Sequence, residues 1–193
     1  MKTIINRIEI CGNIASGKTT LCNGMSQKGY KSIYEEFHKN PFFDDFYEDP
    51  VAYSFETEVT FLLQHYNLIK KQKAESLLVT DYSLLLDMAY ADVNLFGDKQ
   101  KIFFEIVEEL QKEIGLPTKI IHLVCPEEVL LKRIIRRSRD AETSITIDYL
   151  DSLSKAISLR VKDFAKQLPV ITIDSNAVNF TSGIDGIQEY ESI

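Results

Sequence analysis

The chain has 193 residues, a length that predicts a single domain spanning 1–193, with enough material for a sheet covered by helices on both faces. Its net charge of −7 argues against general binding to nucleic acid, so any anion must be held by a local cluster of basic side chains. Hydrophobic residues make up 45% of the chain and charged residues 26%, as in ordinary soluble globular proteins.

The cysteines and the apolar runs favour a cytoplasmic protein. Cys11, Cys22 and Cys125 are scattered and fit no metal-binding spacing, which favours buried reduced thiols. The first residues run directly into a predicted strand without the features of a signal peptide. No apolar run is long enough to span a bilayer, so we expect neither nucleic-acid nor membrane partners.

The first predicted element is a strand with apolar residues between Ile4 and Ile10, and a helix is predicted from Thr20 onward. The glycine-rich stretch between them matches G-x-x-x-x-G-K-[ST], the phosphate-binding P-loop, in the context that this motif requires. Glycines let backbone N–H groups surround a phosphate, and the helix N-terminus adds partial positive charge. Lys18 is expected to reach the terminal phosphates and the Thr19 hydroxyl to bind magnesium. The predicted nucleotide-binding residues are Gly12, Asn13, Ile14, Ala15, Ser16, Gly17, Lys18, Thr19 and Thr20.

A second strand is predicted over 31–34, and it ends in two adjacent carboxylates, Glu35 and Glu36. Open α/β sheets bind ligands at the carboxyl ends of their strands, although a solvated pair of loop residues would look the same in the sequence. An aromatic segment, 42–47, follows, and Asp49-Pro50 then starts a long helix.

The long helix carries an apolar stripe and two polar residues of interest. Glu58 and His65 lie seven residues apart, and therefore on one side of the helix. A lone helix histidine is more often a polar surface residue, so a ligand-facing role for His65 depends on the rest of the chain. Apolar residues at helical spacing predict a core-facing stripe of Val51, Phe55, Val59, Leu62, Tyr66 and Ile69.

A third strand, 77–81, ends at Asp81, where P-loop enzymes place a second magnesium-binding group. Asp81 would equally serve as the cap of the next helix, and so would Ser83. That helix is predicted over 84–93 and carries Asp87.

One strongly basic stretch stands out in this acidic chain. Pro126 starts a predicted helix that runs into it, and a polar loop, 140–144, follows. A charge run is usually a solvated face, but the contrast with the net charge favours a phosphate clamp, because guanidinium groups bind polyphosphate through paired hydrogen bonds. We expect about 136–145 to form a mobile lid that closes over the nucleotide and excludes water. The basic residues are Lys132, Arg133, Arg136, Arg137 and Arg139.

The remaining elements complete an alternating pattern. Helices are predicted over 102–114 and 149–157, and strands over 119–125 and 169–174. Five strands alternating with helices predict a parallel sheet covered on both faces. The predicted fold class is α/β, a three-layer P-loop NTPase sandwich with a five-stranded parallel sheet and an arginine-rich lid.

Taken in this order, the motifs resemble those of the deoxynucleoside kinases over nearly the whole chain. The P-loop is similar to the family's G-N-I-A-A-G-K-S/T. Glu35 lies five residues before Asn40-Pro41, as the family's catalytic glutamate does in many bacterial members, and Glu36 is the neighbouring alternative. The stretch 168–176 also resembles the family's last strand and adenine-side loop.

The resemblance extends to the sugar and base sides of the family's site. Phe46-Tyr47 is similar to the segment with the sugar-binding tyrosine, and Asp81-Tyr82-Ser83 is similar to the D/E-R-S motif, with Asp87 at the base-contacting aspartate. The lid motif R-x-x-x-R-x-R-x-x-E is matched by Arg133, Arg137, Arg139 and Glu142.

Two positions depart from the family pattern. The arginine of D/E-R-S is Tyr82 here, and the base-side arginine of the long helix is His65, so a bidentate fork is lost at both places. The base side, formed by Glu58, His65 and Asp87, therefore departs from the family pattern. A nucleoside outside the usual set, or another small hydroxyl compound, stays open as the acceptor.

The resemblance implies phosphorylation of a (deoxy)nucleoside 5′-hydroxyl to the 5′-monophosphate, a reaction of nucleoside salvage, by a homodimeric enzyme. It implies ATP, or another nucleoside triphosphate, as donor and Mg²⁺ bound by Thr19 and Asp81. The implied catalytic residues are Glu35, as the base, with Lys18, Arg133, Arg137 and Arg139, and Arg137 also binds the donor. The implied substrate-binding residues are Glu35, Tyr47, Glu58, His65, Asp81, Tyr82, Asp87 and Glu142.

Two other functions stay open at this point. A P-loop kinase of nucleoside monophosphates or of another small molecule shares the phosphate-binding loop, but the acidic residues Glu35, Glu58 and Asp87 favour a neutral acceptor. A nucleotide-binding regulator without turnover would fit the two lost arginines. A turnover assay across a panel of nucleosides distinguishes these functions.

Overall fold

The computed structural model describes residues 6–72, 77–178 and 180, so predictions for Ile4, Ile5 and most of the polar end after Asn176 lie outside the described residues. The strands are β1 (Arg7–Gly12), β2 (Lys31–Ile33), β3 (Leu78–Thr80), β4 (Lys119–Val124) and β5 (Val170–Asp174). The α-helices are α1 (Lys18–Gln27), α2 (Phe43–Glu48), α3 (Pro50–Lys70), α4 (Leu84–Asn94), α5 (Gly97–Ile114), α6 (Glu127–Arg137) and α7 (Ile147–Phe164). Two short 3₁₀ helices are η1 (Phe37–Lys39) and η2 (Asp140–Ser144).

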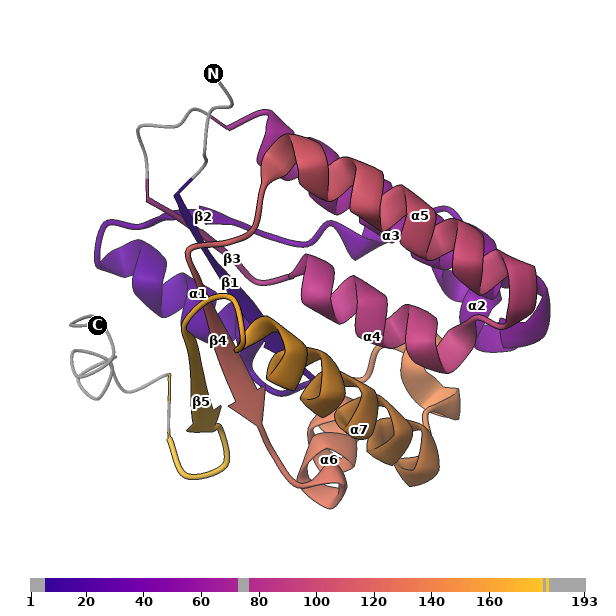
Figure 1. Cartoon of the computed structure of the whole chain (residues 1–193). Helices are drawn as coiled ribbons and strands as arrows, with labels where there is room; N and C mark the ends of the chain where they lie inside the picture. Colours follow the sequence, from indigo (N-terminus) through magenta and orange to yellow (C-terminus); the bar gives the residue numbers. More distant parts are fainter. Residues whose placement is uncertain (1–5, 73–76, 179, 181–193) are drawn as a thin grey trace.

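The strands form one five-stranded sheet in the order β2-β3-β1-β4-β5. All four neighbouring pairs are parallel. Helix α1 lies on one face of the sheet, while α4 and α7 pack against each other on the opposite face, with α3 and α5 extending that helical layer (Figure 1). The predicted α/β class and the parallel sheet covered on both faces are thus confirmed.

The alternation of side chains along β1 explains why the sheet has two separate cores. Ile8 and Ile10 point to one face, where they pack with Leu21 and Met25 of α1. Cys11 points to the opposite face and belongs to the larger core formed with α3, α4, α5 and α7. Since a parallel sheet must be covered on both faces, this central strand is buried along its whole length.

Side-chain caps fix where the helices begin. Asp49 accepts a hydrogen bond from the Ala52 N–H at the start of α3, with Pro50 in the first turn. Ser83 accepts from the Leu86 N–H and caps α4. Of the two candidate caps for α4, the structure therefore uses Ser83, which leaves the Asp81 carboxylate for other partners.

Two details of the sequence prediction are wrong. Val51 was placed in the core stripe of α3, but it is 92% exposed, because the first turn of the helix borders an open hollow of about 470 Å³. The stripe is buried only farther along, at Leu62 and Ile69. The segment 140–144 was predicted to be a loop and instead forms η2.

Within the described part of the chain, the helices include none that combines the length and apolarity needed to cross a bilayer.

Candidate active site

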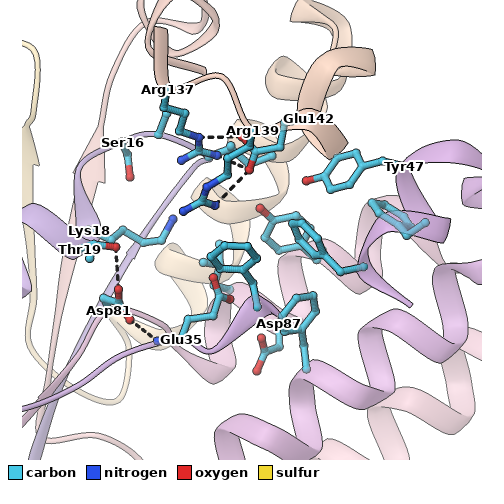
Figure 2. A pocket seen from close by; sticks show the side chains of 18 of the residues that line it. Ser16, Lys18, Thr19, Glu35, Tyr47, Asp81, Asp87, Arg137, Arg139 and Glu142 are labelled. Atoms are coloured by element: carbon cyan, nitrogen blue, oxygen red, sulfur yellow. Dashed lines mark hydrogen bonds and ion pairs between the residues drawn. The ribbon is translucent and has the colours of Figure 1, made fainter. Parts of the chain in front are cut away.

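A cavity of about 370 Å³ opens where β1, β2 and β3 end, within the size range of small-molecule sites. The P-loop follows β1, Glu35 follows β2 and Asp81 follows β3. Carboxyl ends of parallel strands are the usual ligand-binding edge of an open α/β sheet. Figure 2 shows Lys18, Glu35 and Arg139 directed toward the same space from different sides.

Two glycines make the P-loop conformation possible. Gly17 has φ 102° at the start of α1, a value that side chains beyond glycine rarely adopt. At Gly12, a Cβ atom would lie 2.7 Å from the Leu123 carbonyl oxygen and 2.7 Å from Ser16 Oγ. Substitution at Gly12 would therefore displace the loop from β4.

The polar groups of the P-loop are arranged around an anion-sized space. Lys18 Nζ donates to the carbonyl oxygens of Gly12 at 2.9 Å and Asn13 at 3.2 Å. Burial lowers the pKa of Lys18, against the opposing charges of Glu35 and Asp81. The Ser16 hydroxyl is buried with no hydrogen-bond partner among the described residues, which fits a phosphate oxygen as its missing partner.

Not every predicted P-loop residue faces the cavity. Residues 14–20 line it, whereas Gly12 and Asn13 do not. The Asn13 amide instead donates to the Leu150 carbonyl oxygen and to Ser154 Oγ, both at 2.8 Å. Asn13 thus anchors the loop to α7, a role that spacing alone does not reveal.

Thr19 and Asp81, for which magnesium binding is predicted, lie in direct contact. The Thr19 hydroxyl donates to Asp81 Oδ2 at 2.7 Å, and Asp81 Oδ1 accepts from the Glu35 backbone N–H at 2.7 Å. The described residues contain no cluster of three or more acidic, histidine or cysteine side chains suited to a metal. Hard oxygen donors suit Mg²⁺, which commonly takes its remaining ligands from phosphate and water, so the pair fits this ion.

Glu35 and Glu36 point in different directions. Glu35 lines the cavity, while Glu36 pairs with Lys39 at 2.7 Å outside it. Burial opposes ionisation of Glu35, but His65, Lys18 and Arg139 together lower its pKa below the ordinary value. The geometry therefore favours Glu35 over its neighbour as the carboxylate that meets a substrate.

His65 and Tyr82, the residues at the two family arginine positions, are absent from the cavity lining. They lie behind it as a parallel ring stack, with centroids 4.1 Å apart and planes 10° apart. His65 Nδ1 lies 2.9 Å from Asp87 Oδ1, and Asp87 does line the cavity. The expectation that His65 and Tyr82 contact substrate directly is not met by this placement.

Glu58 lies at the same end of the cavity as Asp87 and is buried. Its Oε1 accepts a hydrogen bond of 2.7 Å from the Asn94 amide. Burial raises the pKa of Glu58 to about 8, with the negative charges of Asp87 and Glu35 acting in the same direction. Glu58 is therefore mostly a neutral carboxylic acid at pH 7.

The arginine-rich segment, 133–144, covers the other end of the cavity. Arg137 Nε donates to Glu142 Oε2 at 2.7 Å, and Arg139 donates to Glu142 Oε1 at 3.3 Å (Figure 2). Arg133 donates to the Ser175 carbonyl oxygen at 2.9 Å and to that of Ala15 at 3.3 Å. The segment thus joins the P-loop and brings all three predicted arginines to the cavity.

The same segment also contacts the residues after β2. The Arg139 guanidinium lies 4.2 Å from the ring centroid of Phe37 in η1. The Ser144 hydroxyl donates to the Tyr47 carbonyl oxygen at 3.2 Å, next to the Tyr47 side chain that lines the cavity. Burial raises the pKa of Tyr47 well above its ordinary value, so its hydroxyl keeps its proton.

Sequence reasoning missed most of the apolar wall. The sequence indicates an aromatic segment over 42–47 and predicts a role in the site for Tyr47. A ring that lines a site and a ring that fills a core have the same spacing, so no signal in the sequence separated them. The additional apolar lining residues are Phe37, Phe43, Phe46, Phe61, Leu86 and Tyr90.

Comparisons with known proteins identify the family and the fold. The chain is 29% identical to a deoxyguanosine kinase of Bacillus subtilis, across 90% of this chain and 88% of that protein. It is also 29% identical to a deoxyadenosine kinase of Dictyostelium discoideum, across 96% and 80% of the two chains. The fold is similar to that of a deoxyadenosine kinase from M. mycoides solved with bound dCTP, with a TM-score of 0.84, 22% identity and coverage of 97% and 100%. The sequence profile of the deoxynucleoside kinases matches residues 8–189, and the chain therefore belongs to the deoxynucleoside kinase family.

Proposed function

We propose that this protein transfers the terminal phosphoryl group of ATP, or of another nucleoside triphosphate, to the 5′-hydroxyl of a deoxynucleoside. Its family makes it a phosphotransferase that acts on a hydroxyl group. The observation that carries the more specific assignment is that Glu35 and Lys18 line one cavity. A proton acceptor and a phosphate-binding cation are thereby available to the same reacting hydroxyl.

The donor half of the site is built from the P-loop and the arginine-rich segment. P-loop N–H groups, Ser16 and Lys18 bind the phosphates, and Thr19 with Asp81 holds Mg²⁺, which neutralises charge on the phosphates when bound. Arg137 and Arg139 stabilise the charge on the transferred group. Arg137 uses two of its nitrogens on Glu142 and Arg139 uses one, so both guanidinium groups keep further N–H donors for phosphate oxygens.

At the acceptor, Glu35 accepts the 5′-hydroxyl proton as the hydroxyl oxygen forms a bond to the terminal phosphorus. The bond from that phosphorus to the bridging oxygen breaks, and its electron pair leaves with the nucleoside diphosphate. The other product is the deoxynucleoside 5′-monophosphate. Tyr47 and Glu142 bind the remaining sugar hydroxyl.

The charge distribution along the cavity favours an uncharged acceptor. Its cationic lining residues, Lys18 and the three arginines, come from the P-loop and the arginine-rich segment. The opposite end presents Glu58 and Asp87 among aromatic rings, with no lysine or arginine in the described lining. That end fits an uncharged base, and at the reacting end the Glu35 carboxylate disfavours an acceptor that already carries a phosphate, because like charges repel.

A coupled assay of ADP release across deoxynucleosides, nucleoside monophosphates and other small alcohols tests this function. Glu35→Gln should lower kcat by roughly 10²–10⁴-fold, the usual cost of removing a general base, with little change in the KM for ATP. Glu36→Gln is the matched control, because that side chain pairs with Lys39 outside the cavity. Turnover of monophosphates alone would support another kinase, and ATP binding without any turnover would support a regulator.

A further inference from the structure

His65 occupies a buried position behind the cavity, where aromatic rings fix the plane of its imidazole. Its ring is parallel to that of Tyr82 at 4.1 Å. Phe61 also stacks on it, with centroids 5.8 Å and planes 28° apart. Only 2% of His65 is exposed, so the ring has no room to turn toward solvent.

The two nitrogens of this ring face two different carboxylates. Nδ1 lies 2.9 Å and 3.0 Å from the oxygens of Asp87, and because a carboxylate only accepts, Nδ1 carries the proton and donates. Nε2 lies 3.5 Å from Glu35 Oε1. Nε2 is buried and has no hydrogen-bond partner among the described residues, so Glu35 is the acceptor within its reach.

The charge of the ring matches this arrangement. Burial favours a neutral imidazole, but Asp87 and Glu35 outweigh that effect and raise the pKa of His65 to about 10. Both ring nitrogens therefore carry protons at neutral pH. Tyr82 stands where the family pattern has an arginine, and within the described residues His65 is the cation at ion-pair distance from Glu35.

We propose that His65 is a positioning residue for Glu35: clamped by its ring neighbours and by Asp87, it directs Nε2–H at the Glu35 carboxylate and orients that carboxylate toward the acceptor hydroxyl. The inference rests on the proposed function, because His65 acts through the proposed base. The Glu35 side chain is only half-buried, so the distance of 3.5 Å between His65 Nε2 and Glu35 Oε1 can shorten when substrate fills the cavity. His65 itself stays outside the lining and does not touch substrate.

A consequence is that the two ends of the acceptor site are connected. Asp87 lines the base end of the cavity and Glu35 the end near Lys18, and the His65 ring bridges them from behind. This bridge gives the chain a substitute for the missing arginine fork. Nδ1 contacts Asp87 and Nε2 faces Glu35, so a substitution can remove one of these contacts and keep the other.

Asparagine and glutamine at position 65 separate the two contacts. The amide nitrogen of asparagine falls near the place of Nδ1, and that of glutamine near the place of Nε2, so His65→Gln keeps a donor for Glu35 and His65→Asn does not. A misplacement of about 1 Å can cost roughly 10²-fold in rate, so we expect a kcat loss of roughly that size for His65→Asn and a clearly smaller one for His65→Gln. The KM for ATP should not change in either variant.

The same two substitutions in a Glu35→Gln background test whether His65 acts through Glu35. His65→Asn should then cause no further loss of kcat, because the group that it positions is already gone. His122→Asn is the matched control, since His122 is also buried but lies in β4 outside the cavity lining, and its kcat should equal that of the wild type. Thermal unfolding of each variant separates loss of fold from loss of rate.

Each outcome decides the question. A larger kcat loss in His65→Asn than in His65→Gln, absent in the Glu35→Gln background, supports the positioning role. Equal losses in the two variants, or the same loss with and without Glu35, overturn it and leave His65 as a packing residue. If the wild type phosphorylates no nucleoside, the proposed function fails first and this inference fails with it.

Discussion

Glu58 shows how burial changes what a single side chain offers a ligand. An ionised carboxylate only accepts hydrogen bonds, whereas a protonated one also donates. Burial raises the pKa of Glu58 to about 8, while Asn94 donates to its Oε1. The second oxygen is then free to carry the proton, so this end of the cavity presents a donor beside the Asp87 acceptor.

This proton gives the stability of the protein a defined dependence on pH. Between the ordinary pKa of 4.5 and the raised value of about 8, the folded protein keeps the Glu58 proton and the unfolded chain has lost it. Stability therefore falls as pH rises through this window. In Glu58→Gln, which mimics the protonated form, that contribution is absent. Urea unfolding should show the variant gaining stability relative to the wild type from pH 5 to pH 8, and parallel profiles would contradict the assignment.

The residues of the site differ in how far the sequence alone could place them. Lys18 and Thr19 follow from motif spacing, because the P-loop dictates its own geometry. The sequence alone could not decide between Glu35 and Glu36. Both follow the same strand, and only their contacts in the fold show that Glu35 lines the cavity while Glu36 pairs with Lys39. The position of His65 behind the cavity depends on its stacking with Tyr82, a contact between α3 and the second residue after β3 that no local pattern specifies.

The proposed lid, formed by the end of α6 and by η2, is held in place by a fork of hydrogen bonds. Arg137 donates through two of its nitrogens to the two oxygens of Glu142, and Glu142 is buried. A lysine keeps the charge but cannot form this fork with a carboxylate or a phosphate. The function of the element therefore depends on guanidinium geometry as well as on net charge.

Arg137→Lys should accordingly lower kcat by roughly 10²-fold, near the lower end of the usual cost of losing one preorganised donor to transition-state charge. The matched control is Arg136→Lys on the same helix, because Arg136 is exposed and lies outside the cavity lining. Steady-state ADP release with the best nucleoside substrate measures both. Equal activity of the two variants would show that the charge of this segment suffices without the fork.

At the level of elements, hydrophobic periodicity predicted the order of strands and helices well, because the inner strands β1, β3 and β4 are largely buried and the long helices bury apolar residues at helical spacing. Periodicity gave a wrong result at the first turn of α3 and over 140–144. Val51 continues the apolar spacing of α3, yet its side chain in the first turn is exposed rather than packed in the core. Segment 140–144 looked like a polar loop because its side chains are polar, but Glu142 is turned inward to the arginines, which orders the chain as η2.

Across the whole molecule, a buried ion pair joins the central strand to the helical layer. Arg7 and Glu9 of β1 are fully buried, and Arg7 Nε donates to Glu9 Oε1 at 2.7 Å. Arg7 also donates to the carbonyl oxygens of Ile114 at 3.0 Å and Gly115 at 2.8 Å at the end of α5. Glu9 accepts from the Leu84 N–H at 3.2 Å, at the start of α4. The sequence shows two charged residues in an apolar strand but not that they are partners.

Removing one member of this pair should destabilise the protein far more than removing a surface pair. Arg7→Met leaves Glu9 buried and unpaired, so the free energy of unfolding should fall by about 3–5 kcal/mol. Arg7→Met combined with Glu9→Gln should recover part of that loss, because the glutamine is neutral and still accepts from the Leu84 N–H. Urea denaturation followed by circular dichroism measures these differences.

The matched control for Arg7→Met is Lys155→Met, which breaks the ion pair of 2.6 Å between Lys155 and Asp151 on the exposed face of α7. Exposed pairs contribute about 0–1 kcal/mol, because water solvates both charges and salt screens them. If Arg7→Met costs no more than this control, the pair between β1 and the two helices does not hold the sheet to its helical layer. A large loss that the double variant relieves would instead show that an unpaired charge, rather than lost packing, is the origin of the effect.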